Sequence, residues 1–509
     1  MSDTLKMESS PKVLIRQKRT GIVSTSQLQD DSASSSASSK TDDELSSSNV
    51  GDSQMEARVL RKMDLYIIPL MMLLYFLSNL DKSNIGNAEV SGLSTDLHLK
   101  GAQFNICVSA FFGPYIVSEL FGTHLVKVLG PNVVMSICIL GFGLISLLTA
   151  WCTSYGALLA CRVSLGLFEG MVFPTINMYL SICYRREQYA RRFAYVFFSA
   201  GLSSSFGGLI AYCCSKIHGT LASWQYIFII EGAISLGVIP LFIFGLAKDL
   251  ENSWFFSTDE GQYIIRRYQT MSTVNPDERF DWHQFKLGVI DIKTWISSIA
   301  LFGIDMTTFG LTTFLPSIIS AMGYGSIKAQ LLTIPVFALT ALTFLLCALW
   351  SDHLELRSPF IIAACLTTSI GIVIVLVAKA QGVRYFGVYI LCMGIYVNAA
   401  CNCLWLSGNN GCYFKRATAV GINLFFGSSS GLVSGQIFPA SDKPRFTKGL
   451  SICLAFQSLS IIMTCIQFLL YRRENHKKTD EISIYLLLGH DIPFEEKLGD
   501  MNLEFRYMY

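Results

Sequence analysis

Long apolar segments dominate the sequence and limit the folds open to it. Each is about 20 residues long, enough for an α-helix to cross roughly 30 Å of hydrocarbon. Only 15% of the residues are charged, against roughly 25% in soluble domains, so the apolar surface should face lipid. Barrel strands alternate in polarity and these segments do not. The sequence predicts an all-α membrane protein with twelve transmembrane helices, at about 64–89, 104–126, 132–152, 156–182, 193–215, 225–247, 294–320, 328–350, 359–379, 384–408, 418–440 and 449–471.

Polar stretches divide the chain into two halves and two tails. Residues 1–60 are rich in Ser and lack a sustained apolar run, which predicts a disordered tail. A hydrophilic linker at 248–293 separates two six-helix halves, 61–247 and 294–471, and 472–509 form a second tail. An even number of spans places both termini on one side. That side is predicted to be the cytosol because it carries most of the basic clusters, at Arg185–Arg186, Arg191–Arg192, Lys415–Arg416 and Arg472–Arg473.

The two halves contain similar segments. Cys183-Tyr184 leads to two Phe residues and a Ser/Gly run that begins at Gly201, and Cys412-Tyr413 leads to the same pattern with a run from Gly427. The two segments align at an offset of about 228 residues. Parallel six-span repeats are typical of major facilitator transporters, in which the substrate site lies at the midplane between the halves.

Glu169 is the clearest ionisable residue inside a predicted span. A charge at the membrane centre costs from about 3 to above 10 kcal/mol, so it needs a function or a partner. Arg162 lies seven residues earlier and therefore on nearly the same helix face. Glu169 is predicted to take up and release a proton; the alternative is a fixed pair that braces the bundle.

Asp81 and Lys82 form a second charged position, in the outer part of the first span. Adjacent residues on a helix point about 100° apart, so one of the two can face a cavity while the other contacts a neighbouring helix. Asn84 ends the same polar segment and is a secondary candidate, as is Asp305 in span seven. Glu119 and Glu231 lie nearer to span ends and are interpreted as structural or gating residues.

Span ten carries a polar stripe of three amides and an indole, formed by Asn398, Asn402, Trp405 and Asn409. A polar stripe in lipid must face the protein interior or a wet cavity. Two interpretations stay open: a substrate-binding wall with an aromatic plane for stacking, or hydrogen bonds between helices. Phe309 in span seven is a further candidate for stacking.

Several other function classes find no support in the sequence. The formal net charge of +2 gives no electrostatic case for a nucleic-acid partner. No Walker A sequence, Gly-x-Ser-x-Gly elbow or His-Glu-x-x-His pair is present, and the scattered Cys residues predict no metal site. We therefore expect no enzymatic activity and no cofactor. The ionisable residues inside the spans indicate that protons are the coupling ion.

Three segments resemble the allantoate permease branch of the fungal anion:cation symporters, within the major facilitator superfamily. They are Tyr75–Ala88, Arg162–Pro174 and Trp224–Gly232, and the resemblance extends from about Val59 to the C-terminus. It implies a major facilitator fold in which Asp81 and Glu169 carry protons. It also implies that the basic residue beside Asp81 holds the acid group of the substrate and that Arg162 couples to Glu169. Related symporters usually have Arg where this chain has Lys82, and Lys lacks the bidentate fork.

The resemblance also concerns gating. Loop eight retains the family's Asp352 and Arg357, whereas loop two has lost the Asp of the same signature. The resemblance implies proton-coupled uptake of a small organic anion at the plasma membrane, first of all nicotinic acid for NAD synthesis. Nicotinamide riboside, quinolinate or another vitamin-like carboxylate are alternative cargoes, and a nutrient sensor is an alternative function. The expected partners are the organic anion and membrane lipid, with a monomer as the transport unit.

Overall fold

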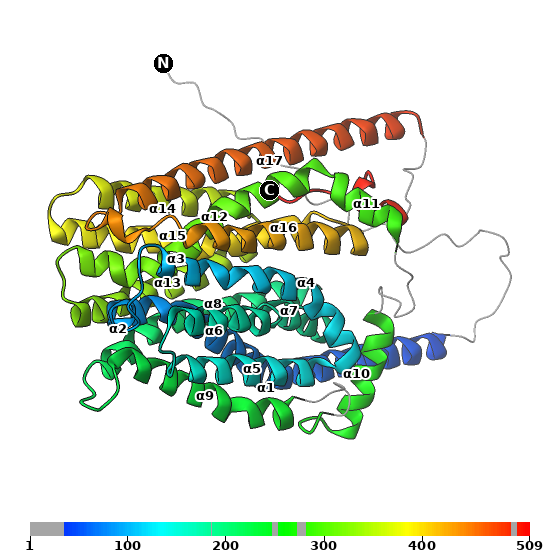
Figure 1. Cartoon of the computed structure of the whole chain (residues 1–509). Coiled ribbons are helices and arrows are strands. Elements are labelled where there is room, and N and C mark those ends of the chain that lie inside the picture. Colours follow the sequence, from blue (N-terminus) through cyan, green and yellow to red (C-terminus); the bar gives the residue numbers. More distant parts are fainter. Residues whose placement is uncertain (1–34, 185, 247–252, 272–280, 490–495) are drawn as a thin grey trace, which may run out of the picture. The chain divides into compact units, whose positions relative to one another are not determined.

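The computed structural model describes residues 35–184, 186–246, 253–271, 281–489 and 496–509 (Figure 1). Internal contacts divide the chain into two units, residues 1–58 and 59–509, and the second unit contains both halves. Residues 1–34 of the predicted N-terminal tail and parts of the predicted linker and C-terminal tail lie outside the described residues, and so does Arg185.

Helices make up nearly all of the described secondary structure, and no strand occurs among the described residues. The first half contains α1 (Ser35–Val90), α2 (Leu93–Asp96), α3 (Gln103–Ala110), α4 (Phe112–Leu129), α5 (Pro131–Thr149), α6 (Tyr155–Glu169), α7 (Val172–Cys183), α8 (Arg186–Cys214) and α9 (Ser223–Gly245). The predicted linker contains α10 (Thr258–Met271) and α11 (Trp282–Ile290). The second half and its tail contain α12 (Ile292–Ala321), α13 (Ser326–Leu354), α14 (Ser358–Val377), α15 (Gln381–Gly408), α16 (Tyr413–Ser434), the 3₁₀ turn η2 (Ala440–Asp442), α17 (Thr447–Leu487) and the 3₁₀ turn η3 (Glu496–Met501).

Eleven of the twelve predicted spans are long and apolar enough, as helices, to cross a membrane. The twelfth, predicted at 418–440, is α16, whose 22 residues are long enough but more polar because of its Ser/Gly run and Lys415–Arg416. α1 begins at Ser35, upstream of the predicted first span and inside the predicted disordered tail, and α17 continues to Leu487, beyond the predicted end of the last span.

Two predicted spans are each split into a pair of helices by a proline. α3 gives way to α4 just before Pro114, and α6 gives way to α7 just before Pro174. Proline lacks an N–H and clashes with the carbonyl of the residue four positions earlier, which interrupts a helix. The second break comes directly after Glu169, so this carboxylate lies at a helix end in the interior of the bundle. Gly170 allows the close approach there, since a Cβ would meet the carbonyl of Tyr115 on α4.

The interface between the halves, here called the seam, is formed mainly by α8 against α13 and by α4 against α16. Figure 1 shows the helices of the second half, from light green at α12 and α13 to orange-red at α17, running alongside those of the first half, from blue to green. α8 and α16 are the two helices of the predicted internal repeat. Their equivalent places in the seam agree with the pseudo-symmetry of the two halves.

Several hydrogen bonds across the seam lie at one end of the bundle, the end that holds the connections 91–102 and 322–325. We call it the distal end and the opposite one the linker end. Gln330 donates to Ser91 at 2.7 Å, and Gln436 donates to Ser109 at 3.0 Å. Asn105 donates to the carbonyl of Phe438 at 3.1 Å. The seam is therefore closed at the distal end, which the predicted orientation places outside the cell.

Within the second half, α14 and α15 pack closely because glycines remove side chains from their contact. A Cβ on Gly394 of α15 would meet the carbonyl of Ala364 and the hydroxyl of Thr368. We expect Gly394→Val to destabilise the protein by about 1–3 kcal/mol through overpacking. Thermal unfolding of the purified protein in detergent measures the change. Gly382→Val is the matched control, because Gly382 lies on the same helix with no heavy atom within 4 Å of its Cβ position; equal losses in both variants would contradict the packing argument.

Candidate substrate and proton site

Lys82 and Glu169 meet in the interior of the first half. The Nζ atom of Lys82 lies 4.0 Å from Oε2 of Glu169, and the Glu169 side chain is fully buried. Lys82 also donates to the Tyr115 hydroxyl at 3.3 Å and lies over the Tyr115 ring, 4.4 Å from its centre. Ser78 donates to the same Glu169 oxygen at 3.5 Å, while Oε1 has no hydrogen-bond partner. The pair is therefore close but incompletely satisfied, as suits a group that gains and loses a proton.

Asp81 faces a different helix from Lys82, as the 100° step between neighbours predicts. Its Oδ1 accepts a hydrogen bond of 2.9 Å from Ser146 on α5, and Oδ2 has no hydrogen-bond partner. Only 2% of Asp81 is exposed. Lys82 therefore faces the seam, while the hydrogen bond between Ser146 and Asp81 connects α5 to α1.

Arg162 is a buried cation with unused hydrogen-bond donors. It is 3% exposed, and its Nε and Nη2 atoms have no hydrogen-bond partner. The guanidinium carbon lies 5.7 Å from the centre of the Phe228 ring, and the group interacts electrostatically with Glu169 and Asp81. Glu231 on α9 is 1% exposed, has neither oxygen hydrogen-bonded, and interacts with Asp81 and Arg162.

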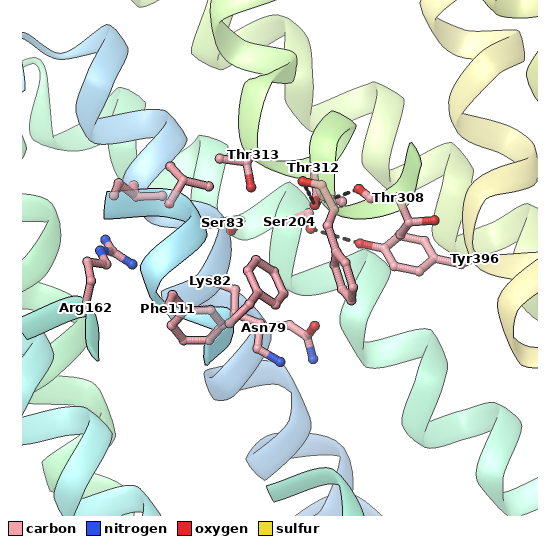
Figure 2. A pocket seen from close by; sticks show the side chains of 14 residues that line it. Asn79, Lys82, Ser83, Phe111, Arg162, Ser204, Thr308, Thr312, Thr313 and Tyr396 are labelled. Atoms are coloured by element: carbon pink, nitrogen blue, oxygen red, sulfur yellow. Dashed lines mark hydrogen bonds between the residues drawn. The ribbon is translucent and has the colours of Figure 1, made fainter. Parts of the chain in front are cut away.

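A small cavity of about 50 Å³ lies in the seam beside these groups. Lys82, Arg162 and Phe309, three of the predicted substrate residues, line it. The rest of the lining is Asn79, Ser83, Ile85, Val108, Phe111, Phe112, Ser204, Thr308, Thr312, Thr313 and Tyr396. Figure 2 shows Lys82, Arg162 and Phe111 of the first half across from Thr308, Thr312 and Tyr396 of the second. Both cations thus come from the first half, whereas hydroxyl groups and aromatic rings line the cavity from both halves.

Two secondary candidates lie outside that lining. Asn84 is fully buried with neither amide atom hydrogen-bonded, and a Cβ on Gly207 would lie 3.3 Å from its Oδ1. Asp305 on α12 lies against Gly427 of α16, where a Cβ would come within 2.6 Å of its Oδ2. Among the described residues, no group of three His, Cys, Asp or Glu side chains is arranged to hold a metal ion.

The polar stripe of span ten is also absent from the lining, because its residues have protein partners. Asn398 donates to the sulfur of Cys365 at 3.6 Å, and Asn402 accepts hydrogen bonds of 3.1 Å from Ser297 and Asn423. Trp405 donates through Nε1 to the carbonyl of Met508 at 2.9 Å. The geometry is that of the alternative interpretation, in which the stripe makes hydrogen bonds within the protein.

The C-terminal segment 496–509 occupies the linker end of the second half. Asn409 holds it through both backbone groups of Met508, accepting from the N–H at 2.7 Å and donating to the carbonyl at 3.0 Å. The backbone N–H of Arg357 donates to the carbonyl of Tyr509 at 2.7 Å. The predicted gating residues pair with each other at this position, with Arg357 Nη2 2.7 Å from Asp352 Oδ1.

Removing the Asn409 amide tests this attachment. We expect Asn409→Ala to weaken it by about 1–3 kcal/mol, because two hydrogen bonds to Met508 are lost. Trypsin cleavage after Arg506, followed by mass spectrometry of the purified full-length protein, measures release of the segment. Trp405→Phe removes a single hydrogen bond and should give a smaller increase in cleavage, whereas unchanged cleavage in Asn409→Ala would contradict the assignment.

Sequence reasoning missed several residues of the cavity, notably Phe111, Phe112, Tyr396 and Ser204. Tyr396 lies two residues before Asn398, about 200° around the helix, so it is on the face opposite the polar stripe and the stripe does not point to it. Its hydroxyl lies 3.3 Å from that of Ser204 on α8, across the seam. Phe111 and Phe112 lie at the proline break of span two, where helical periodicity no longer predicts direction.

Comparison with known proteins assigns the family. The family model of the Major Facilitator Superfamily matches residues 71–435. The chain belongs to the Major Facilitator Superfamily. It is 65% identical over 455 residues to the high-affinity nicotinic acid transporter of Saccharomyces cerevisiae, covering 89% of this chain and 85% of that protein. It is also 34% identical to an uncharacterised transporter of Schizosaccharomyces pombe, covering 90% and 91% of the two chains.

Solved structures of this superfamily share the fold. A crystal structure of a D-xylose–proton symporter superposes with a TM-score of 0.63 at 14% identity, covering 79% of this chain and 97% of that one. The predicted major facilitator fold with two halves is thereby confirmed. This chain is a multi-pass membrane transporter of the superfamily, and the cavity lies between its halves, where members of the superfamily bind substrates.

Proposed function

We propose that this transporter takes up nicotinic acid at the plasma membrane together with protons. The proposal of the cargo is supported by the 65% identity to the high-affinity nicotinic acid transporter of Saccharomyces cerevisiae. The chemistry of the cavity supports it independently, because nicotinate combines a carboxylate with a flat aromatic ring. The transport unit is a monomer, and both termini lie in the cytosol.

The observation that carries the proposal is the free hydrogen-bonding capacity of Arg162. Its Nε and Nη2 atoms are buried without hydrogen-bond partners, and the residue lines the cavity. A guanidinium can hold a carboxylate through two parallel hydrogen bonds. Lys82 is already engaged with Glu169 and Tyr115. Arg162 therefore holds the acid group of the substrate, and Lys82 couples that site to Glu169.

The pyridine ring has suitable neighbours in the same cavity. Phe111, Phe112, Phe309 and Tyr396 line it, and the Phe112 and Phe309 rings pack 4.9 Å apart from opposite halves. Aromatic pairs at such distances contribute about 0.5–1.5 kcal/mol beyond the burial of their area. A ring bound beside Phe112 and Phe309 would contact both halves at once, which makes binding sensitive to closure of the seam.

Proton coupling follows from the charges around the site. Among the described residues, the interior of the first half holds the carboxyl groups of Asp81, Glu119, Glu169 and Glu231 but only two cations, Lys82 and Arg162. Adding a substrate anion would increase the excess of negative charge in a medium of low dielectric constant. Protonation of Glu169, with Asp81 as a second carrier, lowers that cost. Release of the proton on the cytosolic side then weakens the hold on the anion.

Transport driven by a pH difference tests the proposal. We expect purified protein in liposomes to accumulate labelled nicotinate when the outside is more acidic, and to stop when the pH difference and voltage are removed. Glu169→Gln should abolish this accumulation but retain at least part of the exchange of internal for external nicotinate, since exchange needs no net proton movement. Equal loss of accumulation and exchange would assign Glu169 a structural role. Unlabelled quinolinate and nicotinamide riboside, added as competitors, test the cargo.

The assignment of the acid group to Arg162 is tested separately by binding. We expect Arg162→Gln to weaken nicotinate binding roughly 10- to 100-fold, because a charge-assisted bidentate contact is lost. Lys82→Gln should alter the pH dependence of uptake more than the affinity. Equilibrium binding of labelled nicotinate to the purified variants measures both effects. Wild-type affinity in Arg162→Gln together with lost binding in Lys82→Gln would reverse the two roles.

A further inference from the structure

Glu119 is a buried carboxylate that connects the two halves. It lies on α4, is 8% exposed, and accepts a hydrogen bond of 2.8 Å from the Ser428 hydroxyl of α16. Other hydrogen bonds across the seam, such as those of Gln330, Gln436 and Asn105, lie nearer to the distal end and use amides and hydroxyls. Glu119 thus places an ionisable group on the inner side of the closed region.

A second carboxylate approaches the same position from the opposite half. Asp305 of α12 lies against Gly427, the residue before Ser428, at a distance that leaves no room for a Cβ. Asp305 and Glu119 interact electrostatically across the seam. Within the described part of the chain, Asp305 forms no hydrogen bond or ion pair. Two acidic groups, one from each half, therefore lie against neighbouring residues of α16 where the halves are in contact.

The remaining groups around Glu119 connect it to the substrate site. Lys82 interacts electrostatically with both Glu119 and Glu169, and Tyr115 lies one turn from Glu119 on α4. Among the described residues, Cys403 of α15 is a titratable neighbour of both carboxylates, Tyr75 of α1 interacts with Asp305, and α16 presents the Ser428 hydroxyl. The helices α3, α5 and α7, which complete the surroundings of α4 and α6, contain no charged residue. Lys82 is thus a cation shared by two carboxylates.

We propose that Glu119 and Asp305 form a proton-dependent latch that holds the distal end of the seam closed. This inference rests on the proposed proton-coupled transport. When both groups are ionised, two negative charges oppose each other at low dielectric constant and drive the halves apart. One proton on either group removes the repulsion and leaves the hydrogen bond from Ser428 to Glu119 in place.

The shared lysine links the latch to the substrate site. When Glu169 is protonated, Lys82 no longer has a charged partner there and can neutralise Glu119, which favours closure. When Glu169 loses its proton to the cytosol, Lys82 returns to it and Glu119 is left to repel Asp305. The empty transporter then opens at the distal end. Glu119 and Asp305 act through the conformational change and have no assigned contact with the substrate.

Cross-linking across the distal end tests the latch without any cargo. Ser109 and Gln436 are hydrogen-bonded there at 3.0 Å, so Ser109→Cys and Gln436→Cys place two thiols across the seam. A short bifunctional thiol reagent is applied to the purified protein at pH 5 to pH 8, and mass spectrometry quantifies the linked peptide apart from native cysteines. We expect the yield to fall roughly fivefold or more as the pH rises. Glu119→Gln and Asp305→Asn should each keep the yield high at all pH values.

Two further variants separate charge from other effects. Ser428→Ala removes the hydrogen bond but leaves both carboxyl groups, so the yield should still fall as the pH rises. Glu481→Gln changes an exposed carboxylate on α17 and should behave as the wild type. A pH-independent yield in the wild type, or an unchanged pH dependence in both Glu119→Gln and Asp305→Asn, would overturn the latch.

The cross-linking and transport experiments distinguish failure of the latch from failure of the proposed function. A protein whose yield depends on pH through Glu119 but which carries no nicotinate would leave the latch intact and contradict the proposed cargo. A protein that accumulates nicotinate by a pH difference but shows no effect of Glu119 or Asp305 on cross-linking would support the proposed cargo and contradict the latch. Because the two carboxylates lie on different helices, misfolding of one variant leaves the other as a test.

Discussion

The close approach of Lys82 and Glu169 inside the first half is the interaction on which the rest of the site depends. Either charge alone in the membrane interior would cost several kcal/mol, and removing one partner of a buried pair typically costs about 3–5 kcal/mol. At 4.0 Å the two groups are near enough to compensate each other without a short, fixed contact. The helix break after Glu169 and the approach allowed by Gly170 position the carboxylate for this purpose.

The seam is built for reversible contact. Apart from the hydrogen bond that Ser428 donates to Glu119, its hydrogen bonds join amides, hydroxyls and backbone carbonyls, each of which water can replace at a net cost of about 0.5–1.5 kcal/mol. Small residues bring the helices close: a Cβ on Gly431 would meet the Phe112 ring, and one on Gly435 would meet Ser109. The second Ser/Gly run of the internal repeat thus serves helix packing across the halves. An interface of this composition can close firmly at one end and still open at moderate cost.

The fold was largely predictable from sequence because apolar length alone specifies a membrane helix. The relation between Arg162 and Glu169 was also predictable, since helical periodicity determines which residues share a face. Periodicity does not determine what covers that face, however. The stripe at Asn398, Asn402, Trp405 and Asn409 correctly indicated a protein-facing surface, but its partners include Met508, nearly a hundred residues later in the chain. The cavity residue Tyr396 was likewise missed because its position depends on how two distant helices meet.

The two halves differ in their internal connections, and the C-terminal segment accounts for part of the difference. The segment connects the linker ends of several helices of the second half: Lys415 of α16 lies 2.7 Å from Asp500 and 2.9 Å from Asp291, and Lys478 of α17 donates to three of its carbonyls. Such cross-connection makes the second half a stiff body. The first half instead concentrates the ionisable groups whose charges change with protonation. A change of charge near Lys82 displaces helices at the seam. If the second half deformed easily, this displacement would stay local. Because the second half is stiff, the displacement instead rotates one half against the other.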